Sequence, residues 1–157
     1  MDKNKIKTYA ISILIALAVG GIGGLFTAMG MDSFDALTKP PLTPPSILFP
    51  IVWTILYILM GISAARIYMA PPTATRNHAL IVYFIQLAVN LLWSIIFFNL
   101  EAYGFAFFWL LLLLALIFTM IYLFSKVDKF AALLQIPYAI WVTFAGYLNL
   151  MIWLLNK

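Results

Sequence analysis

Cysteine is absent from the 157-residue sequence, and histidine occurs only once, as His78. Without cysteine the chain can form no disulfide, no thiolate metal site and no cysteine nucleophile. A single histidine cannot build a cluster of metal ligands, so we expect no metal site. The sequence therefore predicts neither thiol chemistry nor a metal centre.

Charged residues are also scarce. They make up 9% of the chain, against roughly 25% in soluble domains, while 66% of the residues are hydrophobic. The nine Lys and Arg residues and the five Asp and Glu residues are too few and too scattered for the basic surface that nucleic-acid binding requires. The composition predicts a protein whose partner is a lipid bilayer, with no nucleic acid.

Long hydrophobic runs are the most prominent feature that is present. Five of them approach the ~20 residues that cross a hydrocarbon core, and turn or charged residues separate them. The first run exceeds the apolar part of a secretory signal and lacks a cleavage site, so we expect a retained helix. We predict one all-α membrane domain over residues 1–157, a bundle of five transmembrane helices. The predicted spans are about residues 6–29, 47–69, 78–98, 102–124 and 130–155.

The connection over residues 30–46 is the only long polar segment between these spans. Each proline fixes φ and disfavours helix in the residue before it, so we expect a stiff loop over one end of the bundle. We call this segment the lid. It contains Pro40, Pro41, Leu42, Pro44 and Pro45.

Positive charge is distributed unequally between the two ends of the predicted spans. Lys and Arg near span ends favour the cytoplasmic side. We therefore expect a bacterial-type cytoplasmic membrane, with the N-terminus cytoplasmic and the lid and C-terminus outside. The N-terminal side carries Lys3, Lys5, Lys7, Arg66, Arg76, Lys126 and Lys129, and the lid side carries Lys39 and Lys157.

Aromatic and amide side chains recur at helical spacing in three of the spans. Polar residues within a span usually face the bundle interior, so each stripe marks an inward surface. The stripes are Phe49, Trp53, Tyr57 and Gly61 in the second span, Gln86, Asn90, Trp93 and Phe97 in the third, and Tyr138, Trp141, Ala145, Leu148 and Asn149 in the fifth.

These stripes have two interpretations. Large flat rings beside small residues and amides leave room for a planar apolar ligand, which the amides would orient. Alternatively, the rings fill the core and the amides form only interhelical hydrogen bonds. In the second case the protein is a structural or stress-signalling partner and not a binding protein.

Gly20 and Gly24 form a small-xxx-small pair in the first span. Such a pair allows another helix to approach closely. We favour packing within the same bundle, with dimerisation as the alternative.

The order and spacing of the motifs resemble those of the TspO/translocator protein family. Members are also called tryptophan-rich sensory proteins or peripheral-type benzodiazepine receptors. The resemblance extends over all five spans. It rests on Lys39-Pro40, Pro44-Pro45, Phe49, Trp53, Leu56-Tyr57, Met60-Gly61, Gln86-Leu87, Asn90, Trp93, Phe97-Phe98, Pro137-Tyr138, Trp141, Ala145 and Leu148-Asn149.

The resemblance implies a five-helix membrane protein, often a homodimer, that binds protoporphyrin IX or haem as a ligand and needs no obligatory cofactor. It also implies that two pocket tryptophans, which match Trp53 and Trp141, take part in light-dependent porphyrin breakdown in some members. The expected ligand-binding residues are Phe49, Trp53, Tyr57, Gln86, Asn90, Trp93, Tyr138, Trp141, Ala145 and Leu148.

Two positions depart from the family pattern. Leu42 in the lid and Ile47 at the start of the second span stand where relatives usually carry tryptophan. We expect the absence of these two tryptophans to affect porphyrin breakdown more than porphyrin binding. We expect a tetrapyrrole-binding receptor or sensor, with photo-oxidative porphyrin degradation as a second activity. The alternative is a transporter of porphyrins or other small amphiphiles.

Overall fold

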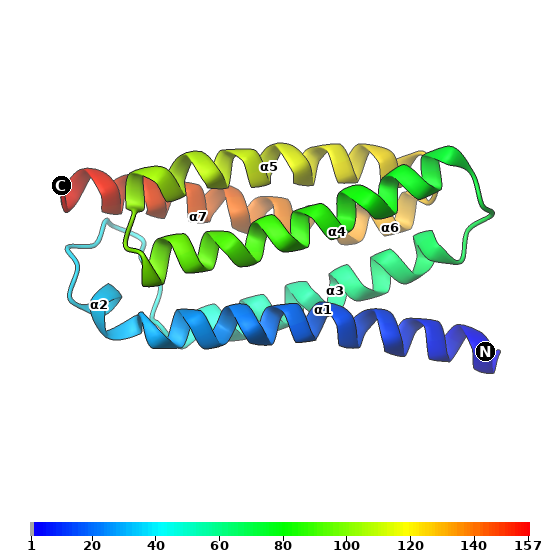
Figure 1. Cartoon of the computed structure of the whole chain (residues 1–157), viewed down its shortest axis with the longest axis horizontal. Coiled ribbons are helices and arrows are strands. Elements are labelled where there is room, and N and C mark those ends of the chain that lie inside the picture. The colour runs from blue at the N-terminus through cyan, green and yellow to red at the C-terminus, as the bar shows by residue number, and fades with distance from the viewer. Residues whose placement is uncertain (1) are drawn as a thin grey trace.

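The computed structural model describes residues 2–157 and is helical throughout its spans (Figure 1). Five helical stretches are long and apolar enough to cross a membrane, which confirms the predicted bundle. The elements are α1 (Lys3–Met29), α2 (Met31–Asp35), α3 (Leu48–Tyr68), α4 (Ala74–Ser94), the π-helix η1 (Ile95–Asn99), α5 (Tyr103–Ser125), α6 (Lys129–Leu134) and α7 (Ile136–Leu155).

Local chemistry sets the helix boundaries. The third span begins at Ala74, four residues before its predicted start, because the Thr73 hydroxyl accepts a hydrogen bond from the Arg76 amide and caps the helix. The fifth span is interrupted at Gln135, between α6 and α7. Pro137, in the first turn of α7, has no backbone N–H and so cannot continue the helical hydrogen bonds of α6. The lid contains a short helix, α2, which the sequence analysis did not predict.

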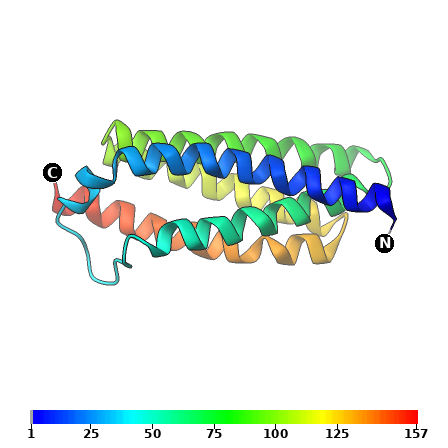
Figure 2. The same ribbon diagram turned by 90° about the horizontal axis from the view of Figure 1, so that it is seen from below.

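The bundle has two distinct ends (Figures 1 and 2). The N-terminus, the α3–α4 connection and the α5–α6 connection lie at one end, and the lid and the C-terminus lie at the other. Along the bundle, α1 packs against α3 and also contacts α4 and η1, while α5 contacts α4, α6 and α7. The lid therefore covers the end opposite the N-terminus.

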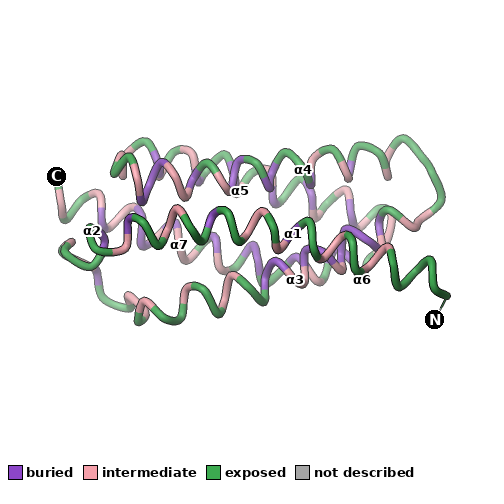
Figure 3. Tube along the Cα trace, turned by 60° about the horizontal axis from the view of Figure 1, so that its bottom comes forward, coloured by how far each residue is buried: buried purple, intermediate pink, exposed green. Residues whose placement is uncertain are grey.

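Burial follows the facing sides of the helices, and the outer sides are exposed (Figure 3). The outer surface is nevertheless apolar, because large side chains such as Leu14, Leu25, Phe105 and Phe108 point away from the core. Exposed apolar surface of this extent needs an apolar solvent. The helices thus bury an inner surface against each other and present an outer one suited to lipid.

Glycines permit the close approach of α1 to α3. A Cβ built on Gly61 would lie 2.5 Å from Ile13 Cα, and Ser12 Oγ donates a 2.7 Å hydrogen bond to the Gly61 carbonyl. A Cβ on Gly20 would lie 2.5 Å from Tyr57 Cδ2. Gly20 therefore packs inside the bundle, whereas Gly24, the other member of the small-residue pair, is exposed.

Replacing Gly61 with alanine is expected to lower the free energy of unfolding by about 1–3 kcal/mol, because the new methyl group must push α1 away from α3. Gly21→Ala is the matched control. Outside the backbone of α1, no atom of the described residues lies within 4 Å of a Cβ at Gly21, so the change costs no packing and favours helix. Unfolding midpoints in detergent test this; equal midpoints for the two variants would contradict it.

Candidate functional site

A cavity of about 620 Å³ lies within the lid half of the bundle, in the size range of small-molecule sites. Helices α1, α3, α4 and α7 form its walls together with η1, and α2 covers it. The wall residues include Gly20, Gly21, Gly23 and Gly24 from α1, Phe49, Trp53 and Tyr57 from α3, Asn90 and Trp93 from α4, Phe97 and Phe98 from η1, and Trp141, Ala145, Leu148 and Asn149 from α7.

Most of the expected ligand-binding residues meet in this cavity, but Gln86 and Tyr138 do not line it. The Tyr138 hydroxyl donates a 2.6 Å hydrogen bond to Gln86 Oε1, and the two residues are 1% and 0% exposed. They occupy the packed half of the bundle beyond Asn90. A stripe shows which face of a helix points into the bundle, but it does not show where along the helix the cavity ends. Gln86 and Tyr138 therefore point inward, as expected, but lie beyond the end of the cavity.

Aromatic rings dominate the cavity wall. Trp53 lies against Tyr57 with ring centroids 5.7 Å apart, and Trp141 meets Phe49 edge-on at 6.1 Å. Trp93 stacks on Phe97 at 5.2 Å. These are geometries that aromatic pairs prefer. The wall offers flat electron-rich surfaces to a planar ligand.

Hydrogen bonds between helices hold some of these rings in place. Asn90 Nδ2 donates to the Tyr57 hydroxyl at 2.9 Å. The indole N–H of Trp93 donates to Asn149 Oδ1 at 3.0 Å, and Asn149 Nδ2 donates in turn to the Tyr103 carbonyl at 2.9 Å. Because each of these bonds joins two segments of the cavity wall, they fix the cavity shape.

Trp141 is different. Its indole nitrogen is buried and has no hydrogen-bond partner among residues 2–157. A buried N–H without a partner costs free energy, and a ligand acceptor would recover it. Among the described residues, none that lines the cavity carries a charge. The cavity therefore suits an apolar planar molecule that accepts a hydrogen bond.

Sequence reasoning missed the π-helix η1. The Leu100 amide bonds to the Ile95 carbonyl, five residues back, at 3.0 Å. This wider turn changes the helical register, and both Phe97 and Phe98 are buried and line the cavity. The sequence carried only a weak signal, the Phe97-Phe98 pair, since two adjacent residues of an α-helix point about 100° apart.

Phe34 on α2 was also missed. It is 4% exposed and lines the cavity from the lid side, with its ring 6.0 Å from that of Phe49 and 5.7 Å from that of Phe98. A single aromatic residue between Asp32 and Asp35 was the available signal, because such a residue in a polar loop must find apolar contacts.

The lid covers the cavity through residues outside its proline cluster. Met31, Phe34 and Ser46 of the lid line the cavity, as does Ile47, which directly follows the lid. The lid residues expected from the sequence lie outside the lining: they are Pro40, Pro41, Leu42, Pro44 and Pro45. Leu42 is 78% exposed and has a φ of 73°, whereas Ile47 stands at the cavity wall. Of the two departures from the family pattern, only Ile47 changes the cavity lining.

Helix α7 holds the lid down by hydrogen bonds. The Tyr147 hydroxyl donates to the Pro41 carbonyl at 2.9 Å. The Asn156 side chain both accepts from the Thr38 amide at 2.9 Å and donates to the Thr38 carbonyl at 2.8 Å. The C-terminal end of the chain thus fixes both the wall and the cover of the cavity.

Asn156→Ala is expected to raise hydrogen exchange around Thr38 by about fivefold or more, because the two lost hydrogen bonds each stabilise the closed lid by about 0.5–1.5 kcal/mol. Thr143→Ala is the matched control, since the Thr143 hydroxyl bonds only within α7, to the Ala139 carbonyl. Exchange measured by mass spectrometry on the detergent-purified protein tests this. Equal exchange in the two variants would show that Asn156 does not restrain the lid.

Comparisons with known proteins agree with this architecture. The TspO/MBR family model matches residues 12–154. Protein CrtK of Rhodobacter capsulatus is 39% identical, covering 94% of this chain and 92% of the relative. The tryptophan-rich protein TspO of Chlorobaculum tepidum is 38% identical over 97% and 98% of the two chains, and the translocator protein of Bos taurus is 30% identical over 94% and 90%.

The family match extends over nearly the whole chain, and its five apolar helices account for the bundle. This chain is an integral membrane protein that belongs to the TspO/MBR family.

Proposed function

We propose that this protein is a membrane receptor or sensor that binds a tetrapyrrole, such as protoporphyrin IX or haem, in the cavity under the lid. The observation that carries the proposal is the aromatic cavity of about 620 Å³, lined by Trp141, whose buried indole N–H has no partner among residues 2–157. A planar macrocycle would stack on the indoles, and a carbonyl or carboxylate oxygen would accept from Trp141. Asn90 and Tyr57 would orient its polar edge.

The packing beyond the cavity supports a receptor over a transporter. Transport requires access from both ends, and the bundle closes on the inner side of Asn90. The Tyr138–Gln86 hydrogen bond and the buried Met60 and Tyr83 occupy that region. A transporter of small amphiphiles would have to open this packed half.

We also propose that the N-terminus faces the cytoplasm of a bacterial-type membrane and that the lid and the C-terminus lie outside, because of the bias in Lys and Arg. A homodimer is a further proposal from the resemblance. Its interface would not use Gly20, which faces Tyr57, whereas Gly24 is exposed and remains available to it.

Photo-oxidative porphyrin degradation is a second candidate activity, favoured by the presence of both Trp53 and Trp141 at the cavity wall. An indole is an electron-rich ring, and an excited porphyrin stacked on it can take one electron from it. Dioxygen would take this electron from the reduced porphyrin and become superoxide, and the indole radical cation would then take one electron from the porphyrin ring and return to indole. Superoxide would combine with the resulting porphyrin radical cation, so that dioxygen adds to the ring and the tryptophan is restored. The reaction needs no acid or base from the protein.

In the dark, protoporphyrin IX is expected to bind saturably and to quench tryptophan fluorescence. Trp141→Phe should weaken binding about five- to tenfold, because the ring remains while the N–H donor is lost. Trp109→Phe is the matched control: the Trp109 indole N–H donates to the Val89 carbonyl at 2.8 Å, away from the cavity lining. No saturable binding, or equal losses in both variants, would argue against the proposed site.

Under illumination in air, the wild-type complex is expected to lose its porphyrin absorbance faster than complexes of Trp53→Phe or Trp141→Phe. The comparison is made at saturating ligand, so that occupancy does not differ. Bleaching that is independent of both tryptophans would exclude their role in degradation but would leave the binding proposal standing.

A further inference from the structure

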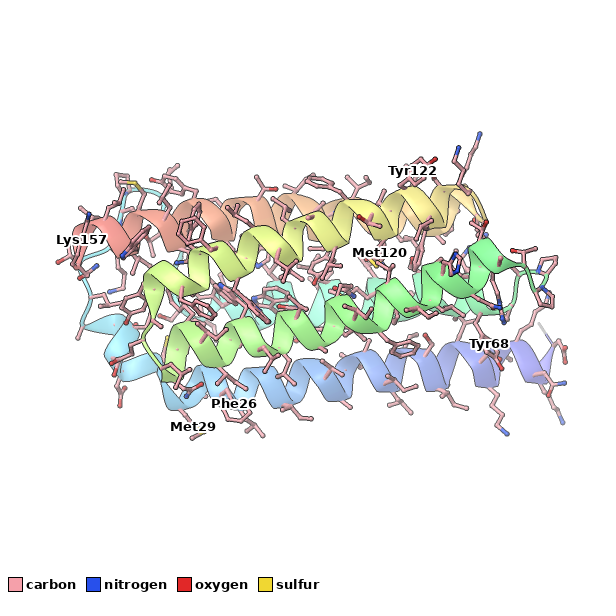
Figure 4. The ribbon with its side chains drawn as sticks, turned by 45° about the horizontal axis from the view of Figure 1, so that its top comes forward. Phe26, Met29, Tyr68, Met120, Tyr122 and Lys157 are labelled. Carbon is pink, nitrogen blue, oxygen red and sulfur yellow. The ribbon has the colours of Figure 1, made fainter. Side chains whose placement is uncertain are left out.

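Charge is strongly separated between the two ends of the bundle. The end with the N-terminus carries seven cations and two carboxylates, while the lid end carries two cations and three carboxylates. Tyr68 and Tyr122 lie at the cationic end, and Lys157 lies at the opposite end (Figure 4). The cationic end therefore has a net charge of about five positive charges, and the lid end has about one negative charge.

The two carboxylates at the cationic end are already engaged. Asp128 Oδ2 accepts a 2.8 Å hydrogen bond from Arg66 Nε, and Asp128 Oδ1 caps α6 by accepting from the Phe130 and Ala131 amides. Partial burial tends to raise the pKa of the Asp128 carboxyl, but these hydrogen bonds lower it overall, so the group is ionised at neutral pH. Asp2 caps α1 through the Asn4 amide.

The lysines at this end consequently lack acidic partners. The Arg66–Asp128 pair is the only salt bridge among residues 2–157. Lys5 is exposed and forms no hydrogen bond within that part of the chain. These cations are free to bind an anion from outside the chain.

A shallow pocket of about 370 Å³, largely open to its surroundings, lies beside Lys5, between α1, the end of α3 and the α5–α6 connection. Lys5, Tyr9 and Arg66 supply donors around it, with Asp128 paired to Arg66 at one side, and Met69 and Val127 supply apolar surface. Cationic donors beside apolar side chains match a phospholipid headgroup and the start of its acyl chains.

Aromatic residues place this pocket at a membrane surface. The Arg66 guanidinium lies 4.8 Å from the Phe130 ring, the Arg76 guanidinium 5.0 Å from the Tyr68 ring, and Lys126 Nζ 5.1 Å from the Tyr122 ring. Aromatic and cationic side chains gather at the level of lipid headgroups. The pocket therefore faces headgroups rather than open water.

We propose that this pocket binds the headgroup phosphate of an anionic phospholipid, with Lys5 and Tyr9 contacting the phosphate and Arg66 closing the site. Each cation near an anionic surface strengthens attraction about fivefold. Binding to the cationic end is independent of the cavity under the lid, which lies at the other end of the bundle.

The test compares phosphatidylglycerol with phosphatidylcholine of the same acyl chains, bound to the detergent-purified full chain and counted by native mass spectrometry. We expect the wild type to retain phosphatidylglycerol about fivefold or more in preference, and Lys5→Gln to lose most of this preference. Lys157→Gln removes one positive charge at the lid end and is expected to keep the preference for phosphatidylglycerol. Higher salt should reduce the preference of the wild type.

Three outcomes would overturn the proposal: equal retention of the two lipids by the wild type, a Lys5→Gln variant that keeps the full preference, or a Lys157→Gln variant that loses as much. Competition with inorganic phosphate distinguishes a lipid site from a site for free anions. If millimolar phosphate displaces phosphatidylglycerol completely, the pocket is a site for free anions and not for a lipid. Lys5 is exposed, and both variants should therefore fold as the wild type does, which thermal unfolding verifies.

Discussion

Side chains that cannot face lipid must find partners inside the bundle, and this constraint determines the rest of the structure. A spanning helix satisfies its own backbone, so its amides, hydroxyls and indole N–H groups decide which face turns inward. Asn90 pairs with Tyr57, Gln86 with Tyr138, and Trp93 with Asn149. Each pair joins two different helices. Together they set the rotation of α3, α4 and α7, and thereby the rings that face the centre.

Residue size then decides where the bundle is hollow. In the half towards the N-terminus, Gly61 lets α1 reach α3 closely, and the core there is filled. In the lid half, no described atom outside the backbone of α1 lies within 4 Å of a Cβ built on Gly21 or Gly24, and the rings of Trp53 and Trp141 line the cavity. Small residues thus give close packing where a neighbouring helix fits, and a cavity where large rings hold the walls apart.

The sequence predicted the spans and most of the cavity wall, because both depend on local patterns. Hydrophobic runs identify helices, and stripes such as Phe49, Trp53 and Tyr57 identify inward faces. The depth of Gln86 and Tyr138, the register change of η1 and the position of Phe34 depend on contacts between distant segments. No local spacing encodes them. Hydrogen bonds such as Tyr147 to Pro41 join residues over a hundred positions apart and likewise emerge only in three dimensions.

The central claim is that a planar ligand occupies the cavity lined by Trp53 and Trp141. Ala145 lines this space from α7, and a larger side chain there would fill it. Protoporphyrin IX binding to Ala145→Phe, measured by fluorescence titration on protein whose unfolding midpoint matches the wild type, tests the claim most directly. The account predicts loss of saturable binding. Unchanged affinity in the folded variant would show that the porphyrin binds elsewhere.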